Sequence, residues 1–216
     1  MKCLLILSLL SASAWPQVAT KANEGYKTKE GRERVARKLG AHDRDTTQKP
    51  TEVIAAMDLK PGMTAADLGT GIGYMLPFLS AAVGPTGKVF AEDIFPDFLD
   101  QARDRAKEKA LGNVEFVLGT IKDPKLPANA VDRILILDAY HHFDFPADML
   151  GVIARSLKPG GRLVIIDFYK DGFGDPNHIR LEEVDVIKEV EANGFRSLSS
   201  RPLTPKRQYT AVFEKK

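Results

Sequence analysis

The sequence predicts an α/β fold, in which a doubly wound and mostly parallel sheet is covered by helices on both faces and ends in an antiparallel hairpin. Short apolar runs, typical of strands buried on both faces, alternate with amphipathic helical stretches from residue 50 onward. Near the C-terminus two strand-like runs follow each other without a helix between them, which indicates an antiparallel pair. The chain has 216 residues, which suits one such domain rather than two.

Composition and charge disfavour several classes of protein. Apolar residues make up 44% of the chain and charged residues 28%, close to globular averages, so long disorder and a polytopic membrane protein are disfavoured. The net charge of +2 gives no reason to expect a nucleic-acid partner or a polybasic membrane anchor. No stretch approaches the ~18 apolar residues of a membrane span. The oligomeric state stays open.

Residues 1–14 resemble a secretory signal. One positive residue, Lys2, precedes the apolar run Leu4–Leu10, and an Ala-x-Ala pattern ends at Ala14. The pattern predicts cleavage after Ala14 and export to the periplasm or the exterior, and the alternative is an uncleaved N-terminus on a cytoplasmic protein. Cleavage would remove Cys3, the single cysteine, so the mature chain would have neither a disulfide nor a thiolate nucleophile.

Residues 15–49 form a basic segment before the main domain at residues 50–216. Between Lys21 and Lys49 nine Lys and Arg residues stand against five acidic ones. A solvated helix over residues 31–39 is one interpretation, with Val35 and Leu39 toward the core, and a mobile lid over a ligand is the other.

Strands and helices are expected to alternate along the main domain. Buried strands are predicted at Thr64–Leu68, Lys88–Ala91, Val114–Leu118, Val131–Leu137 and Arg162–Ile166. Helices are predicted at Glu52–Met57, Pro96–Leu111, Asp148–Leu157 and Leu181–Asn193, the second and third with apolar residues at helical spacing. The hairpin strands are predicted at Phe195–Ser200 and Arg207–Glu214, joined through Pro202 and Pro205.

The most informative motif is a glycine-rich turn after the first strand. Asp67, Gly69, Gly71 and Gly73 follow an acid-x-Gly-x-Gly-x-Gly spacing, and glycines there let backbone N–H groups approach a ligand at the carboxyl edge of the sheet. The dinucleotide fingerprint is Gly-x-Gly-x-x-Gly instead, and the Lys-Ser/Thr pair of a nucleoside triphosphate loop is missing. The turn therefore indicates a different nucleoside-type ligand.

An acid at the end of the second strand supports this interpretation. Asp93 lies at the tip of the strand next to the glycine turn, where a carboxylate can accept both hydroxyls of a ribose. The alternative role for Asp93 is to cap the next helix, but we expect Asp97 to be that N-cap.

With these motifs in order, residues 48–213 resemble the class I S-adenosylmethionine-dependent methyltransferases, and most of all the small-molecule, quinone-biosynthesis C-methyltransferase type. The resemblance rests on Lys60–Met63, Asp67–Gly73, Gly87–Asp93, Leu135–Phe143 and Leu157–Leu163. It implies a Rossmann-like, seven-stranded sheet, S-adenosyl-L-methionine as cofactor and a small-molecule methyl acceptor. Residues 50–216 would then be the methyltransferase domain.

The same resemblance implies where the cofactor binds. The implied cofactor-binding residues are Asp67, Gly69, Thr70, Gly71 and Gly73 for the methionine part, Asp93 and Ile94 for the ribose, Thr120, Ile121 and Asp123 near the adenine, and Asp138. The family usually has an acid where this chain has Thr120, so backbone at Thr120 and Ile121 or the carboxylate of Asp123 would replace that contact.

Three residues beyond the fourth strand are candidates for the chemistry. Tyr140, His141 and His142 would border the acceptor, and a histidine has a suitable pKa for a base near neutrality. Neighbouring side chains in extended backbone point opposite ways, so we expect one histidine to face the pocket; both could also be structural. Asp138 and Asp167 end neighbouring strands, yet two ligands seldom make a Mg²⁺ site, so no metal is expected.

Two alternatives to an active methyltransferase stay open. One is a module that binds S-adenosylmethionine without turnover, and the other is an NAD-dependent oxidoreductase. The glycine spacing and the terminal hairpin count against the oxidoreductase. The identity of the acceptor, and whether oxygen, nitrogen or carbon is methylated, is left open.

Overall fold

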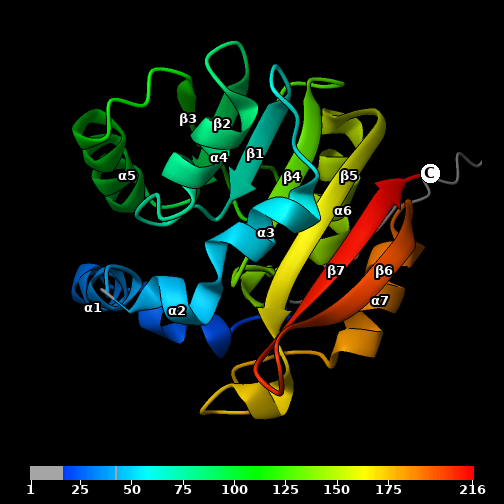
Figure 1. Cartoon of the computed structure of the whole chain (residues 1–216). Helices are drawn as coiled ribbons and strands as arrows, with labels where there is room; N and C mark the ends of the chain where they lie inside the picture. Colours follow the sequence, from blue (N-terminus) through cyan, green and yellow to red (C-terminus); the bar gives the residue numbers. More distant parts are fainter. Residues whose placement is uncertain (1–16, 42) are drawn as a thin grey trace, which may run out of the picture.

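The protein is built around one seven-stranded sheet. The computed structural model describes residues 17–41 and 43–216, so the expected signal at residues 1–14 lies outside the described residues. The strand order is β3-β2-β1-β4-β5-β7-β6 (Figure 1). The strands are β1 (Thr64–Leu68), β2 (Lys88–Asp93), β3 (Val114–Leu118), β4 (Val131–Leu137), β5 (Leu157–Phe168), β6 (Phe195–Thr204) and β7 (Gln208–Lys215). Strands β1 to β5 pair in parallel and β7 pairs antiparallel with both β5 and β6, which confirms the predicted fold class.

Helices cover both faces of this sheet (Figure 1). They are α1 (Lys29–Leu39), α2 (Arg44–Gln48), α3 (Pro50–Met57), α4 (Leu76–Val83), α5 (Pro96–Glu108), α6 (Pro146–Ser156) and α7 (Glu183–Ala192), with short 3-10 turns η1 (Ala22–Tyr26), η2 (Tyr140–His142) and η3 (Lys170–Gly172). Helices α3, α4 and α5 contribute to one apolar cluster, and α6 and α7 to the other. No helix in the described part of the chain is long and apolar enough to cross a membrane.

The strand residues alternate between the two clusters because successive side chains of a strand point to opposite faces. In β1, Ala65 packs with the α3–α4 side and Ala66 with the α6–α7 side. In β4, Leu135 joins the first cluster and Ile134 the second. All four side chains are fully buried, which explains why these strands read as continuous apolar runs.

Proline residues mark three helix starts. Helices α3, α5 and α6 begin at Pro50, Pro96 and Pro146, where the missing N–H would have had no helical partner. The expectation that Asp97 is an N-cap is therefore wrong, because α5 already begins at Pro96. Asp97 lies in the first turn, and its carboxylate accepts two hydrogen bonds from Arg32 Nε at 3.0 and 2.7 Å.

The C-terminal hairpin is present but longer than predicted. Strand β6 runs on from Phe195 through Pro202 to Thr204. A proline is tolerated there because β6 is the edge strand of the sheet, where a missing N–H can face away from the ladder. Strand β5 also begins earlier than the predicted Arg162, at Leu157, and includes Pro159-Gly160-Gly161.

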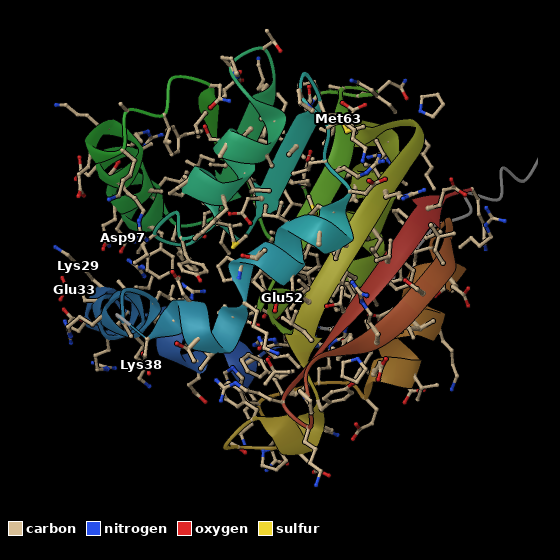
Figure 2. The ribbon with its side chains drawn as sticks, in the orientation of Figure 1. Lys29, Glu33, Lys38, Glu52, Met63 and Asp97 are labelled. Carbon is tan, nitrogen blue, oxygen red and sulfur yellow. The ribbon has the colours of Figure 1, made fainter. Side chains whose placement is uncertain are left out.

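The basic N-terminal segment lies along the carboxyl edge of the sheet, where the strand arrows of Figure 1 point. Lys29, Glu33 and Lys38 of α1 are exposed, and Figure 2 shows them on its outer side. Arg32 instead faces the domain and pairs with Asp97, so the segment is tied to the start of α5. The predicted helix over residues 31–39 is present as α1, with Val35 and Leu39 half-buried. The interpretation as a mobile lid stays a prediction.

The glycine turn after β1 packs directly on α5. Gly73 has φ +77°, and a Cβ added there would lie 3.1 Å from Ala102 Cβ and 2.8 Å from Leu76 Cδ1. We expect Gly73→Ala to lower the free energy of unfolding by about 2–5 kcal/mol, because left-handed backbone costs an alanine about 1–2 kcal/mol and overpacking adds about 1–3 kcal/mol. Urea denaturation measures this. Gly112→Ala is the control, since its site is open and its φ is not positive; equal losses in both variants would contradict the packing argument.

Candidate active site

The glycine turn forms one wall of the site. Gly69 and Gly71 have φ +71° and +56°, and an added Cβ would lie 2.8 Å from Ala139 Cβ at the first and 3.0 Å from Leu39 Cδ1 at the second. The turn is held from below by Thr70, whose N–H donates to Glu92 O at 2.8 Å and whose hydroxyl donates to Asp67 Oδ2 at 2.7 Å. Asp67 is therefore a buried support of the turn rather than part of the cavity wall.

Asp93 joins the end of β2 to the same turn. Its Oδ2 accepts the Gly71 N–H at 2.9 Å and its Oδ1 accepts the Phe95 N–H at 2.9 Å. Each carboxylate oxygen keeps a second lone pair, so the group can still accept hydrogen bonds from a ligand. Burial raises the pKa of Asp93 to about 6, although these N–H groups oppose the shift.

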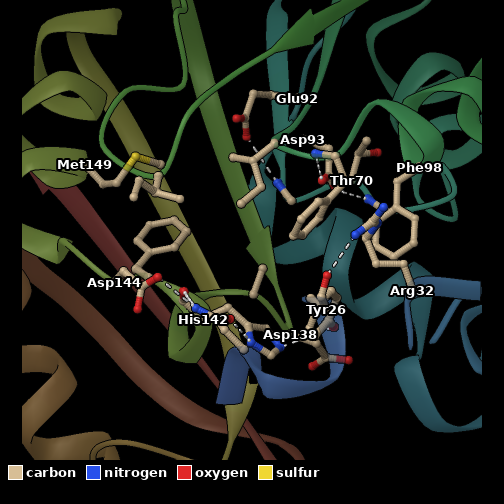
Figure 3. Close-up of a pocket in the computed structure, with 18 of the residues that line it drawn as sticks. Tyr26, Arg32, Thr70, Glu92, Asp93, Phe98, Asp138, His142, Asp144 and Met149 are labelled. Atoms are coloured by element: carbon tan, nitrogen blue, oxygen red, sulfur yellow. Dashed lines mark hydrogen bonds between the residues drawn. The ribbon is translucent and has the colours of Figure 1, made fainter. Parts of the chain in front are cut away.

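A cavity of about 390 Å³ opens between the sheet edge and the N-terminal segment, within the usual range for small-molecule sites (Figure 3). The N-terminal segment supplies Gln17, Thr20, Asn23, Tyr26, Lys27, Arg32, Leu39 and Arg44 to its lining. The sheet edge and the following loops supply Gly69, Thr70, Gly71, Glu92, Asp93, Ile94, Phe95, Phe98, Thr120, Ile121, Leu137, Asp138, Ala139, His142, Phe143, Asp144 and Met149.

The expected cofactor residues divide into two groups. Gly69, Thr70, Gly71, Asp93, Ile94, Thr120, Ile121 and Asp138 line the cavity, whereas Asp67, Gly73 and Asp123 do not. The Asp123 carboxylate accepts the Lys125 N–H at 2.7 Å, and its backbone forms a tight turn with Thr120. Gly73 lies behind the turn against α5.

Asp138 occupies a strained position at the end of β4. Its φ of +53° is uncommon for a residue with a side chain and is typical of functional sites. Gln208 Nε2 donates to Asp138 Oδ1 at 2.7 Å, and Gln48 donates to the other oxygen. Burial, with Asp167 nearby, raises the pKa of Asp138 to about 6. Two amides from distant parts of the chain therefore fix this carboxyl group at the cavity floor.

The three residues expected at the acceptor lie in η2 and point in different directions. His142 lines the cavity. His141 is buried, and its Nδ1 lies 2.6 Å from Asp167 Oδ1. Tyr140 is fully buried and its hydroxyl donates to Glu189 Oε1 at 2.6 Å, so its ring belongs to the core behind η2. The backbone of this stretch is a 3-10 turn rather than a strand. The expectation that the two histidine side chains point opposite ways is therefore wrong, because their ring centroids lie 4.1 Å apart.

Glu92 is a further carboxylate in the cavity wall, next to Asp93 in the chain. Its side chain is buried and accepts the Gly69 N–H only weakly, at 3.4 Å. Its Oε1 has no hydrogen-bond partner among the described residues. Burial, with Asp93 beside it, raises the pKa of Glu92 well above its ordinary value. An unpartnered buried acceptor fits a ligand that brings hydrogen-bond donors or positive charge.

Sequence reasoning also missed the aromatic residues on the cavity side of the N-terminal segment. Tyr26 stacks with Phe95 at 5.8 Å between ring centroids and meets Phe98 edge-on at 6.1 Å. Arg32 Nη1 donates a hydrogen bond to Tyr26 O at 3.0 Å, and Figure 3 shows this bond as a dashed line. A single tyrosine in a charged stretch has no periodic pattern around it. The sequence therefore does not predict these contacts, and only the folded structure shows them.

Known proteins resemble this chain in both sequence and structure. A family model described as a methyltransferase domain matches residues 59–210. A ubiquinone/menaquinone biosynthesis C-methyltransferase, UbiE, from Ectopseudomonas mendocina is 35% identical over 115 residues, covering 53% of this chain and 45% of that protein. The chain thus matches a little under half the length of this curated relative.

Solved structures share the fold. A SAM dependent methyltransferase from Aquifex aeolicus superposes with a TM-score of 0.79 and 31% identity, covering 83% of this chain and 96% of that one. The [4+2]-cyclase SpnF superposes with a TM-score of 0.68 at 17% identity, covering 78% of this chain and 81% of that one, which shows the fold alone. Because the family model spans more than half of the chain and agrees with the sheet order and the glycine turn, the chain belongs to the class I S-adenosylmethionine-dependent methyltransferases.

Proposed function

We propose that the protein transfers a methyl group from S-adenosylmethionine to a small, largely apolar acceptor inside this cavity. The observation that carries the proposal is the pairing of Asp93 with the glycine turn at the wall of a ligand-sized cavity. The acidic side chains of Glu92 and Asp93 fit the cofactor. Its ammonium and sulfonium groups carry positive charge, and its ammonium and ribose hydroxyls can donate hydrogen bonds to the two carboxylates.

The residues of the chain would divide the cavity between the two ligands. Gly69, Thr70 and Gly71 bind the amino-acid end, Asp93 accepts the ribose hydroxyls, and Thr120 with Ile121 borders the adenine. When bound, the cofactor supplies a methyl group already activated for displacement. The chain's contribution is then to hold the acceptor in line and to exclude water, since orientation alone supplies a large part of such a rate.

The acceptor side of the cavity is apolar and aromatic. Phe143, Met149 and Leu137 line it, and His142 and Asp144 are its polar groups. Of the three residues expected to border the acceptor, His142 alone lines the cavity, so we keep this role for His142. The cover formed by the N-terminal segment favours a small molecule over a macromolecular acceptor. The name of the UbiE relative supports testing quinols first.

The first test is replacement of the ribose ligand. We expect Asp93→Ala to weaken S-adenosylhomocysteine binding by about 1.5–3 kcal/mol, or roughly tenfold to over a hundredfold, through loss of charge-assisted hydrogen bonds. Calorimetry measures the affinity. Asp100→Ala is the matched control, because Asp100 is exposed and pairs with Arg103 on the surface of α5. Unchanged affinity in Asp93→Ala would move the ribose contact to Glu92.

The second test is the pH dependence of cofactor binding. Asp93 titrates at about 6 in the free protein, and ribose hydroxyls favour its ionised form, so its bound-state pKa should be lower. Affinity should therefore be flat near pH 7.5 and fall as pH drops through about 6, by up to about tenfold per unit. Asp93→Asn should remove the contribution of Asp93 to this fall in affinity with pH, and the contributions of Asp67 and Asp138 should remain. Affinity that rises on acidification would contradict the assignment.

The third test is turnover. We expect the purified protein to form S-adenosylhomocysteine from S-adenosylmethionine in the presence of a small quinol or phenol, followed by mass spectrometry of the methylated product. Amines serve as the comparison set. Tight cofactor binding with no product from any acceptor would support the non-catalytic binding module instead, since a shared fold does not fix activity.

A further inference from the structure

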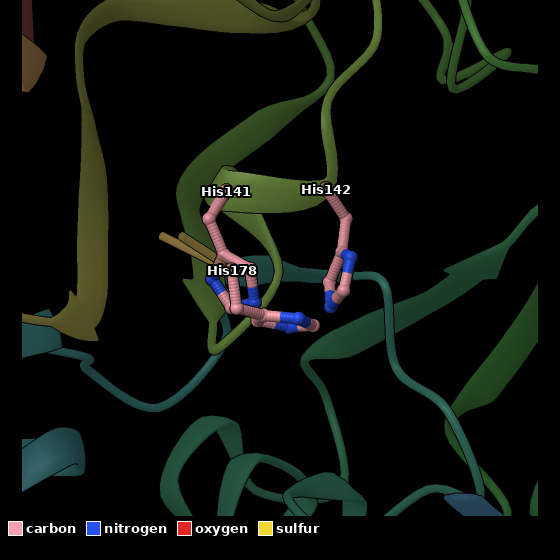
Figure 4. A group of neighbouring side chains, drawn as sticks. All are labelled: His141, His142 and His178. Atoms are coloured by element: carbon pink, nitrogen blue, oxygen red, sulfur yellow. The ribbon is translucent and has the colours of Figure 1, made fainter. Parts of the chain in front are cut away.

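Three histidine rings converge beside the cavity. His141 and His142 come from η2, and His178 comes from the segment between η3 and α7. Their candidate ligand nitrogens all lie within 4.8 Å of one another. Figure 4 shows the three rings turned toward one another below η2. The sequence does not predict this cluster, because His178 is 36 residues beyond His142 and lies in irregular backbone.

The orientation of His141 is fixed by Asp167. His141 Nδ1 lies 2.6 Å from Asp167 Oδ1, so this nitrogen carries the proton and donates it to the carboxylate. The carboxylate is itself held by the N–H groups of His141 and Phe168, at 3.0 and 2.8 Å. The lone pair of His141 is therefore on Nε2. A carboxylate behind a histidine is the usual support of a metal-binding imidazole, because it sets the tautomer and raises the basicity of the free nitrogen.

The tautomer of His142 is fixed in the same sense by Asn23. Asn23 Nδ2 donates to His142 O at 3.0 Å and to Asp144 Oδ2 at 3.1 Å, which determines the orientation of the amide. Its Oδ1 then lies 2.9 Å from His142 Nδ1 and accepts the proton there. The lone pair is on Nε2, 3.4 Å from the Tyr26 hydroxyl.

His178 completes the cluster from the opposite side. Its ring stacks on Phe173 with 4.5 Å between centroids and an interplanar angle of 12°. Its backbone N–H donates to Asp175 O at 2.9 Å, which closes a turn. The three imidazoles lie in contact, with ring centroids 4.1, 5.1 and 5.4 Å apart. Each can offer one ring nitrogen to a cation.

We propose that His141, His142 and His178 form a binding site for a divalent transition metal ion such as Zn²⁺. Three imidazole nitrogens with an open fourth position are a known ligand set for Zn²⁺, whereas Mg²⁺ and Ca²⁺ require oxygen ligands. Nitrogens around a tetrahedral Zn²⁺ at about 2.0–2.1 Å are about 3.3 Å apart, so the rings must close by about 1.5 Å. His178 lies on irregular backbone that can supply this movement.

The metal site and the proposed methyl transfer are separate inferences that share one residue. His142 lines the cavity, so a metal held by the three rings would border the acceptor side and displace the Tyr26 hydroxyl from Nε2. Asp167, in direct contact with His141, supplies a negative charge that offsets part of the charge of the metal. Of the three proposed metal ligands, His142 lines the cavity, whereas His141 and His178 do not.

The test is a metal titration of the untagged protein after chelator treatment. We expect a single equivalent of Zn²⁺ to bind in competition with a chromophoric chelator, and X-ray absorption of the loaded protein to show three imidazole nitrogens at about 2.0–2.1 Å. His178→Gln should weaken Zn²⁺ binding by at least about a hundredfold, because loss of an outer partner alone costs about 10–100-fold. Asn23→Ala should cost about tenfold or more, since it frees the tautomer of His142.

The controls separate this site from adventitious binding and from the cofactor site. Asp100→Asn removes an exposed carboxylate that pairs with Arg103 on the surface of α5 and should leave the Zn²⁺ affinity unchanged. His178→Gln should retain S-adenosylhomocysteine binding, because His178 does not line the cavity. No Zn²⁺ binding at micromolar concentration, or equal binding in wild type and His178→Gln, would overturn the metal site. Failure of S-adenosylhomocysteine to bind the wild-type protein would instead overturn the proposed function and leave the metal result standing.

Discussion

The parallel pairing of β1 with β2 and β4 brings three carboxyl groups to one edge of the sheet. Asp67, Asp93 and Asp138 lie at or just beyond the ends of these neighbouring strands. Asp67 and Asp93 are buried and Asp138 is half-buried. Burial of a carboxylate is unfavourable unless donors or cations face it. Desolvation therefore raises the pKa of each of the three groups to about 6. The arrangement of the surrounding residues follows from the need to satisfy these groups.

Each acid has a different partner, and together the partners shape the cavity. Thr70 satisfies Asp67, the N–H groups of Gly71 and Phe95 satisfy Asp93, and two glutamine amides satisfy Asp138. The first two fix the glycine turn. The third connects the cavity floor to α2 and β7, since Gln208 Nε2 also lies 3.0 Å from Gln48 Oε1. Glu92 Oε1 is a buried acceptor without a hydrogen-bond partner among the described residues, and its side chain belongs to the cavity lining.

The N-terminal segment connects the cofactor side and the histidine cluster. Arg32 fastens it to α5, Tyr26 packs on Phe95 and Phe98, and Asn23 sets the tautomer of His142. Arg44 contributes a buried cation over Tyr74, and burial lowers its pKa. Because this segment lines the cavity, it can exclude water from groups bound there.

The sequence by itself determined the sheet, the glycine turn and Asp93, because these depend on local signals: apolar runs of strand length, glycines at positions of positive φ, and an acid at a strand tip. It also placed the hairpin, although the extent of β6 through Pro202 depended on that strand being an edge. Tertiary structure alone decided that Tyr140 is a core residue, that Asp97 pairs with Arg32, and that His178 meets His141 and His142. These facts join residues far apart along the chain, and such contacts leave no periodic pattern in the sequence that would predict them.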